Sequence, residues 1–189
     1  MTYDPSASLA GGAWSFIETV TVSNQAAVEM DLSGTHKCFM FHIDNLIPIT
    51  DGQELRMRFS TDGGSTFLAA TNYEWALCGS RGAAAISLGE RSTAATSQIN
   101  LTPSSFGSMG DGTAEALNGF VYIHNANQTT NAVCATFEIA AKDSSAVVGG
   151  WAGSGALLSN IDEVDAVQFI SESGNLDTGR ISLYGLSLS

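Results

Sequence analysis

The chain has 189 residues, 44% of them hydrophobic, and its seven basic and nineteen acidic residues give a net charge of −12. This length fits a single domain, and the hydrophobic content is enough for a packed core rather than a disordered chain. The acidic balance argues against nucleic acid as a partner, because that binding relies on basic side chains that neutralise phosphates. Anionic membrane surfaces are disfavoured for the same reason. We expect the charge to act mainly through self-repulsion, with docking onto a basic partner or cation binding as alternatives.

The start of the chain shows no targeting signal. Met1–Gly12 lacks both a basic start and an apolar run, so we expect no signal peptide. No apolar stretch approaches the ~18 residues of a membrane-spanning helix. We expect residues 1–13 to form an N-terminal arm and residues 14–189 to form one domain. The cysteines are odd in number and widely spaced, which predicts small buried side chains in a reducing compartment: Cys38, Cys78 and Cys134.

The first half of the chain predicts β-strands. Alternating apolar and polar residues indicate a strand at Trp14–Val22, which Ser23–Gln25 would join to Ala26–Leu32 as a hairpin. His36–Leu46 is apolar on both faces, as is typical of a central strand between two layers. Gln53–Thr61 alternates cleanly and is expected to bury three side chains and expose three others, with Leu55, Met57 and Phe59 facing inward and Glu54, Arg56 and Arg58 facing outward.

The second half begins less regularly. Residues 79–112 have little periodicity, which predicts long loops and short edge strands. Strands resume at Leu117–His124 and Ala132–Ala141, and a glycine-rich strand follows at Val147–Ala156. The closing segment, Val164–Leu188, predicts two strands around one turn as a final hairpin. Short, regularly spaced strands without an internal repeat or a convincing helix predict an all-β fold, an antiparallel β-sandwich of jelly-roll type.

One turn has a recognisable pattern. Residues 60–67 match the Asp box, Ser-x-Asp-x-Gly-x-Thr-aromatic, which occurs in sialidases and other β proteins. Asp62 can accept hydrogen bonds from turn amides, Gly63 and Gly64 can take positive φ, and Phe67 can pack beneath the turn. Such boxes are structural even in sialidases. The segment therefore predicts a well-formed hairpin turn rather than glycosidase activity.

Candidate metal ligands form no established pattern. His36 and His42 share a strand face but lie about 20 Å apart along an extended strand, too far to hold one ion, whereas His124 could approach either. Oxygen-rich loops leave a Ca²⁺ site open, although no EF-hand loop is present; the acidic residues are Asp111, Asp162, Glu163, Asp165 and Asp177.

Catalytic motifs are also missing from the sequence. There is no Gly-x-Ser-x-Gly elbow, no cysteine–histidine signature and no phosphate-binding loop, so we expect a protein without enzymatic activity or cofactor. Aromatic residues near turn-prone segments offer another role. Trp75 with Tyr73, and Trp151, could stack against a sugar or contact a partner, with core packing as the alternative.

Four segments together carry a resemblance: Trp14–Thr19, Phe39–Leu46, Phe59–Phe67 and Val164–Gly185. Over about residues 14–188 the chain resembles small structural proteins of tailed bacteriophages. That family has no catalytic residues to transfer. The resemblance implies a virion component that decorates the head or forms part of a fibre or tail appendage, without indicating which.

The resemblance also implies partners and a location. A virion protein of this kind would be made in the host bacterial cytoplasm and would contact other capsid or tail proteins, as a homo-oligomer, through exposed strand edges and the N-terminal arm. The alternative is a carbohydrate-binding module that recognises the host surface, for which Trp75 and Trp151 are the residues to test. Neither nucleic acid nor membrane is expected as a partner.

Overall fold

The computed structural model describes residues 13–32, 34–82, 86–103, 108–158 and 163–187. Apart from Ala13, the predicted N-terminal arm lies outside these residues. The described part contains strands and no helix. The strands are β1 (Ala13–Gln25), β2 (Ala27–Asp31), β3 (Cys38–Pro48), β4 (Leu55–Ser60), β5 (Tyr73–Arg81), β6 (Ile86–Arg91), β7 (Ile99–Asn100), β8 (Leu117–His124), β9 (Cys134–Lys142), β10 (Val148–Leu157), β11 (Ala166–Ser171) and β12 (Leu176–Ser187).

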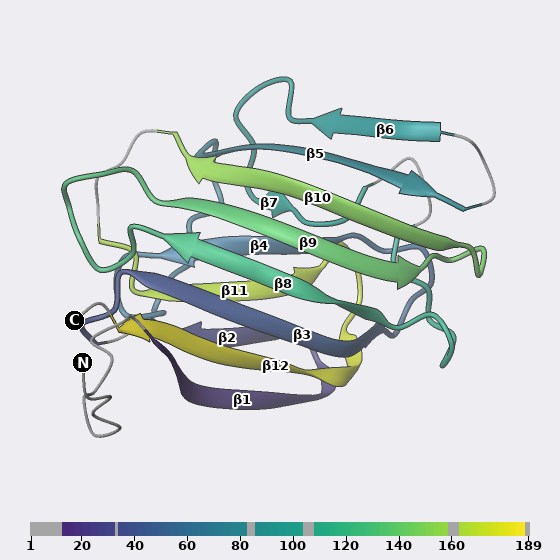
Figure 1. The fold of residues 1–189 in the computed structure, drawn as a ribbon, viewed down its shortest axis with the longest axis horizontal. Helices are drawn as coiled ribbons and strands as arrows, with labels where there is room; N and C mark the ends of the chain where they lie inside the picture. The colour runs from purple at the N-terminus through teal and green to yellow at the C-terminus, as the bar shows by residue number, and fades with distance from the viewer. Residues whose placement is uncertain (1–12, 33, 83–85, 104–107, 159–162, 188–189) are drawn as a thin grey trace, which may run out of the picture.

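Two antiparallel sheets form the fold, and the prediction of an antiparallel β-sandwich is confirmed. The larger sheet has eight strands in the order β1-β12-β3-β8-β9-β10-β5-β6, and the smaller has four in the order β2-β11-β4-β7. In Figure 1 the larger sheet lies in front of the smaller one. The smaller sheet has half as many strands and covers one face of the larger sheet, and no described strand lies over the other face.

The pairing of strands is nested. The first strand pairs with the last, β2 pairs with β11, β3 with β8 and β4 with β7, and successive pairs alternate between the two sheets. The remaining strands, β5, β6, β9 and β10, all join the larger sheet beyond β8. These additions give the larger sheet its extra width.

The core lies between the sheets, where the period of two places alternate side chains. Phe39, Phe41 and Ile43 of β3 are fully buried, whereas the residues between them are only half-buried. Phe41 meets Phe169 of β11 edge to face, with ring centroids 5.1 Å apart. Each fully buried side chain of this size contributes about 1.5–3 kcal/mol, so both rings add to the stability of the sandwich.

The topology shows that the two predicted terminal hairpins do not form. β1 and β2 follow each other in sequence but lie in different sheets, and the same is true of β11 and β12. β11 instead lies between β2 and β4, while β12 lies between β1 and β3. The alternation within a strand shows which of its side chains face the core. It does not show whether the next strand pairs with it or lies in the opposite sheet.

The strand predicted at residues 53–61 is present as β4, with one exception among its outward residues. Glu54 is only 4% exposed. Its carboxylate accepts hydrogen bonds from Asn100 Nδ2 at 2.6 Å and from Arg56 Nε at 3.0 Å. Burial raises the pKa of Glu54, and Arg56 opposes that shift. Glu54 precedes β4, so the alternation of the strand does not govern its side chain.

The Asp-box segment forms a tight turn after β4. Asp62 accepts hydrogen bonds from Thr66 N at 2.8 Å and Thr66 Oγ1 at 2.6 Å, and these bonds lower its pKa. Gly63 and Gly64 have φ of 69° and 77°, which favours glycine. The half-buried Phe67 closes the turn beside Gly64. β4 pairs with β11 and β7 rather than with β5, so this turn redirects the chain and is not the tip of a hairpin.

Candidate interaction surface

The free side of the larger sheet, here called the outer face, consists of the side chains that point away from the smaller sheet. Cross-strand register aligns them in rows. One row runs from Phe16 on β1 through to Arg91 on β6 and crosses all eight strands; its members are Phe16, Tyr184, Met40, Tyr122, Thr136, Ser154, Ala76 and Arg91. Nothing in the described part of the chain covers this face.

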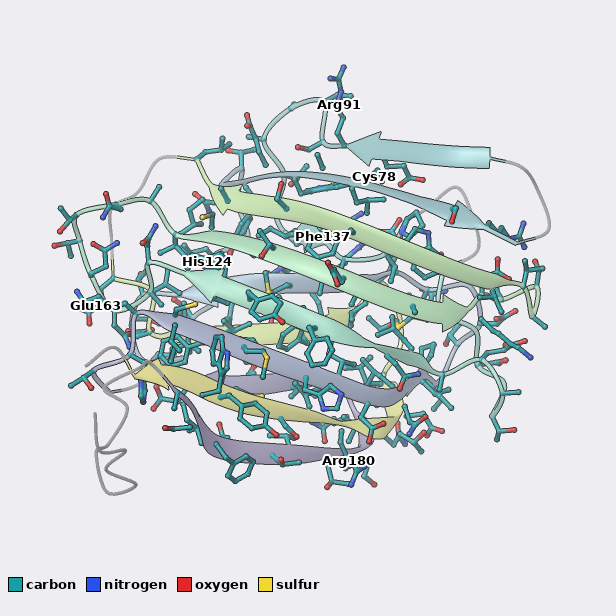
Figure 2. The ribbon with its side chains drawn as sticks, in the orientation of Figure 1. Cys78, Arg91, His124, Phe137, Glu163 and Arg180 are labelled. Carbon is teal, nitrogen blue, oxygen red and sulfur yellow. The ribbon has the colours of Figure 1, made fainter. Side chains whose placement is uncertain are left out.

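Large side chains occupy one half of the outer face, on β1, β12, β3 and β8. We call this half the aromatic ridge: Trp14, Phe16, Met40, His42, Phe120, Tyr122 and Tyr184. Phe16 is 60% exposed, Trp14 39% and Phe120 38%. His42 stacks on Phe120 with ring centroids 4.9 Å apart, and Phe16 meets Tyr184 at 5.7 Å. Figure 2 shows rings gathered over these strands.

Small side chains predominate on the other half, on β9, β10 and β5, apart from Glu74, Glu138 and Lys142. Its floor includes Ala76, Cys78, Gly150, Ala152 and Ser154. Here lies a shallow depression of about 570 Å³, which we call the trough; Phe120 and Glu138 line one side of it and Cys78 lines the other. Residues with so little side chain leave the backbone of the sheet close to the surface. The ridge therefore stands above an adjoining hollow.

Charge on the outer face is balanced. In its cross-strand rows the acidic residues are Asp44, Glu74 and Glu138, and the basic residues are Arg91, Lys142 and Arg180. Three negative and three positive side chains give a formal sum of zero, although the whole chain carries −12. The outer face therefore differs from the chain as a whole in both apolar content and charge.

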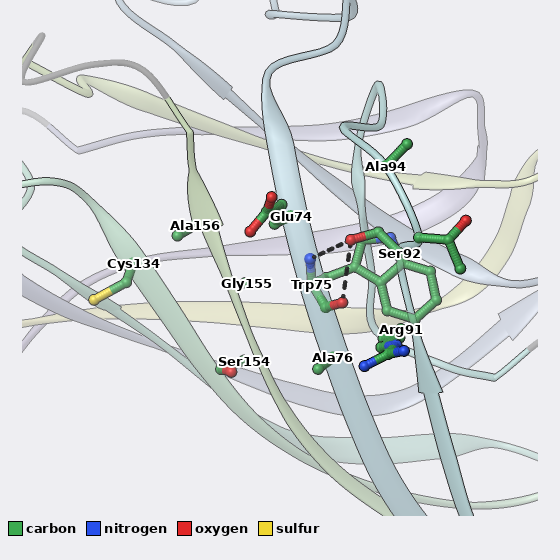
Figure 3. A pocket seen from close by; sticks show the side chains of 11 residues that line it. Glu74, Trp75, Ala76, Arg91, Ser92, Ala94, Cys134, Ser154, Gly155 and Ala156 are labelled. Carbon is green, nitrogen blue, oxygen red and sulfur yellow. Dashed lines mark hydrogen bonds between the residues drawn. The ribbon is translucent and has the colours of Figure 1, made fainter.

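A second depression, which we call the groove, adjoins the trough near the start of β5. It has a volume of about 550 Å³ and contains an indole, an acid, a guanidinium group and hydroxyl groups, from Trp75, Glu74, Arg91, Ser92 and Ser154. The backbone N–H of Trp75 donates a hydrogen bond to Ser92 Oγ at 3.1 Å, which fixes the loop after β6 against β5. Figure 3 shows Trp75 beside Ser92 and Arg91 in this groove.

Two of the three predicted contact aromatics lie in the core instead. Tyr73 is fully buried and Trp151 is 3% exposed. The Tyr73 hydroxyl accepts a bond from Phe59 N at 2.8 Å and donates to Leu68 O at 3.0 Å. Burial raises the pKa of Tyr73 to about 12. Both residues point from the larger sheet toward the smaller one, so neither ring face is open to a sugar or partner. Trp75 is half-buried against the core and borders the groove.

The cysteines differ from the expectation of burial. Cys78 is exposed in the trough, while Cys38 and Cys134 are intermediate. All three point to the outer face and not into the core between the sheets. Cys38 Sγ lies 3.6 Å from His124 Nδ1, and burial and the nearby Cys134 raise the pKa of Cys38. The prediction failed because apolar sequence neighbours on a strand occupy the opposite face of the sheet.

Possible metal ligands converge at one place in the described residues. Oxygens of Asp51, Asp111 and Glu115 lie within 4.8 Å of one another, in loops. Of these, only Asp111 was a sequence candidate. Exposed carboxylates commonly cluster without a metal, so this group alone assigns no ion. His36, His42 and His124 form no such group; His36 meets Phe39 edge to face, whereas His42 stacks on Phe120.

Five titratable groups in the described part of the chain have shifted pKa values, and all five lie outside both depressions. They are Cys38, Glu54, Asp62, Tyr73 and Asp143. The described residues also include no helix long and apolar enough to cross a membrane. Comparison with known proteins gave no matching family model, no matching curated protein and no matching solved structure.

Proposed function

We propose that the chain is a non-enzymatic structural subunit of a bacteriophage particle, which acts through contacts between subunits. The observation that carries this proposal is the outer face: an aromatic, charge-balanced surface on a rigid two-sheet scaffold. Monomeric proteins seldom leave large apolar patches open, and such patches mark interaction sites. The sequence resemblance to tailed-phage structural proteins supplies the kind of particle.

The architecture also supports a finer description of the fold. Setting aside β5, β6, β9 and β10, the nested pairs β1–β12, β2–β11, β3–β8 and β4–β7 are those of one long hairpin wound into two sheets. That arrangement is expected of a jelly roll with eight strands. We include this jelly roll, widened by four extra strands, in the proposal.

Lack of enzymatic activity is part of the same proposal. Catalytic sites gather perturbed ionisable groups in a cleft. Here the groups with shifted pKa values and the two depressions are separate. Glu54, for example, is engaged with Arg56 and Asn100 in a structural network.

The experiment is to find the chain in purified particles. Mass spectrometry should detect it at a stoichiometry that matches symmetric copies, and electron microscopy should place it on the head, a fibre or a tail appendage. A chain that is expressed during infection but absent from washed, intact particles would contradict the proposal.

A carbohydrate-binding role is the second candidate, and the groove beside Trp75 favours it. The indole of Trp75 with Glu74, Arg91 and serine hydroxyls combines apolar and polar groups suited to a sugar. A glycan array should then detect binding that Glu74→Ala and Arg91→Ala abolish. Glu29→Ala, on the smaller sheet, is the matched control. Unchanged binding in the groove variants would remove this candidate.

A further inference from the structure

The outer face joins a raised aromatic half to a hollow half lined by small side chains. We propose that two copies of this chain pack outer face against outer face, with the aromatic ridge of each copy seated in the trough of the other. This inference rests on the proposed function and names the partner of its interaction surface. The partner that we propose for the outer face is a second copy of this chain and not an unrelated protein.

The sequence of β3 predicts burial on both faces, whereas the single chain buries only one of them, and this interface would bury the other. The strand is apolar on both faces, which is the pattern of a strand buried on both sides. In the single chain only Phe39, Phe41 and Ile43 are covered, while Met40 and His42 remain half-exposed on the outer face. β8 repeats this arrangement, with Val121 buried and Phe120 exposed. A second layer over the outer face would bury the uncovered halves of both strands.

Charge indicates what that second layer is. A basic partner would be drawn to the acidic parts of a chain with net charge −12 rather than to a face whose charges sum to zero. For a second copy the preference is reversed, because two chains of −12 repel each other least through their neutral faces. The outer face is thus the surface on which self-association costs the least electrostatic free energy.

Shape gives the symmetry. The boundary between the ridge and the trough runs between β8 and β9, which divides the eight strands into two groups of four. Consider a two-fold axis that lies between the two copies and runs parallel to this boundary. It places each ridge strand of one copy over the strand of the other copy that lies at the same distance from the boundary on the trough side. An interface of this kind is isologous and closes as a dimer.

Cross-strand register then pairs large side chains with small ones. To first order Tyr184 lies over Ala76 of the other copy, His42 over Ala152, and Met40 over Ser154. Facing large and small residues is the condition for two layers to interdigitate. The same two-fold axis keeps charges of the same sign apart. Arg91 lies over Phe16 of the other copy, which allows a cation–π contact, and Glu138 lies over Phe120.

The first test measures the mass of the purified full chain in solution by light scattering and sedimentation. We expect twice the single-chain mass of 19.7 kDa. Ala152→Trp fills the trough and Phe120→Ser removes part of the ridge, so both variants should sediment as monomers with circular dichroism spectra like that of the parent protein. Ile49→Ser is the control, because Ile49 is exposed in the loop after β3, outside the outer face. That variant should remain dimeric.

The second test follows the thiol of Cys78, the most exposed of the three cysteines. Its labelling by a maleimide should slow as the protein concentration rises through the dimer range, and this protection should be lost in Ala152→Trp. A monomeric parent protein, a dimer unaffected by either variant, or Cys78 labelling independent of concentration would overturn the inference. If the chain is present in particles but monomeric when pure, the proposed function stands and only the pairing with a second copy is ruled out. If the chain is a dimer but absent from particles, the dimer stands and the proposed function is ruled out.

Discussion

Trp14 and Tyr122 have ring centroids 6.0 Å apart, although β12 and β3 separate the strands on which they lie. The side chains of Trp14 and Tyr122 therefore reach toward each other over the outer face of β12 and β3. β1 is an edge strand with exposed side chains at its beginning. This contact ties the start of that edge strand to the middle of the sheet.

The Trp14–Tyr122 contact should be measurable as an interaction energy. In a double-mutant cycle with Trp14→Ala and Tyr122→Ala, we expect a coupling of about 0.5–1.5 kcal/mol in the free energy of unfolding by urea. A cycle between Trp14→Ala and Tyr184→Ala tests whether the coupling is specific. Equal coupling in the two cycles would mean that Trp14 acts through general burial and not through this ring pair.

Two glycines of β10 should respond differently to one added methyl group. A Cβ at Gly153 would lie 2.4 Å from Phe137 Cζ and 2.5 Å from Ala76 O, whereas a Cβ at Gly150 would meet nothing closer than Ile139 O at 3.9 Å. We expect Gly153→Ala to cost about 1–3 kcal/mol by overpacking and Gly150→Ala to stay within about 0.5 kcal/mol of the parent protein. Urea titration of both variants makes the comparison. Similar costs at both positions would show that sheet packing does not discriminate them.

The sequence predicts which side chains of a strand are buried more reliably than which strands pair. Leu55, Met57 and Phe59 face the core as expected, because a period of two follows from strand geometry alone. The pairing of β1 with β12 joins the two ends of the chain and has no local signal. β5 carries small and polar residues on its outer side, so its periodicity was too weak to predict a strand.

The candidate site could be predicted only in part for the same reason. Aromatics next to turns suggested Tyr73 and Trp151 as contact residues, but both lie at inward positions of their strands. Met40, His42 and Phe120 come from strands that are apolar on both faces, and sequence cannot tell whether a second layer belongs to the same chain. The exposed ridge becomes visible only once β3 and β8 are placed side by side.

The buried hydroxyl of Tyr73 should stabilise the fold up to alkaline pH. Tyr73→Phe leaves Phe59 N–H without its acceptor, so we expect a loss of about 1–3 kcal/mol at neutral pH, measured by urea unfolding. The pKa of Tyr73 is about 12 in the fold, above its ordinary value, so the folded state holds the proton more tightly than the unfolded chain. This contribution is complete below pH ~10 and is lost as the pH rises toward 12. Tyr184→Phe, on the outer face, is the control and should change the free energy by less than about 0.5 kcal/mol. If Tyr73→Phe and the parent protein lost stability in parallel above pH ~10, another group would be responsible.

The buried carboxylate of Asp143 should stabilise the fold in the opposite pH direction. Its Oδ1 accepts bonds from Ser145 N at 2.8 Å and Val147 N at 3.0 Å, and its Oδ2 accepts one from Arg81 Nε. Burial alone would raise the pKa of Asp143, but Arg81 and the two amides outweigh it and hold the pKa below its ordinary value. The stabilisation is therefore complete above the unfolded pKa of ~3.9 and is lost as the pH falls through the lower, folded value.

Asp143→Asn tests this by removing the charge while keeping an acceptor for the amides. We expect a loss of about 1–3 kcal/mol at pH 7, because the amide cannot accept from Arg81 as strongly as the carboxylate does. The difference from the parent protein should shrink as the pH is lowered past the folded pKa. Asp44→Asn breaks the ion pair with Arg180, whose side chain is 60% exposed, and should cost no more than about 1 kcal/mol. A pH-independent difference between Asp143→Asn and the parent protein would assign the loss to packing of the side chain and not to its charge.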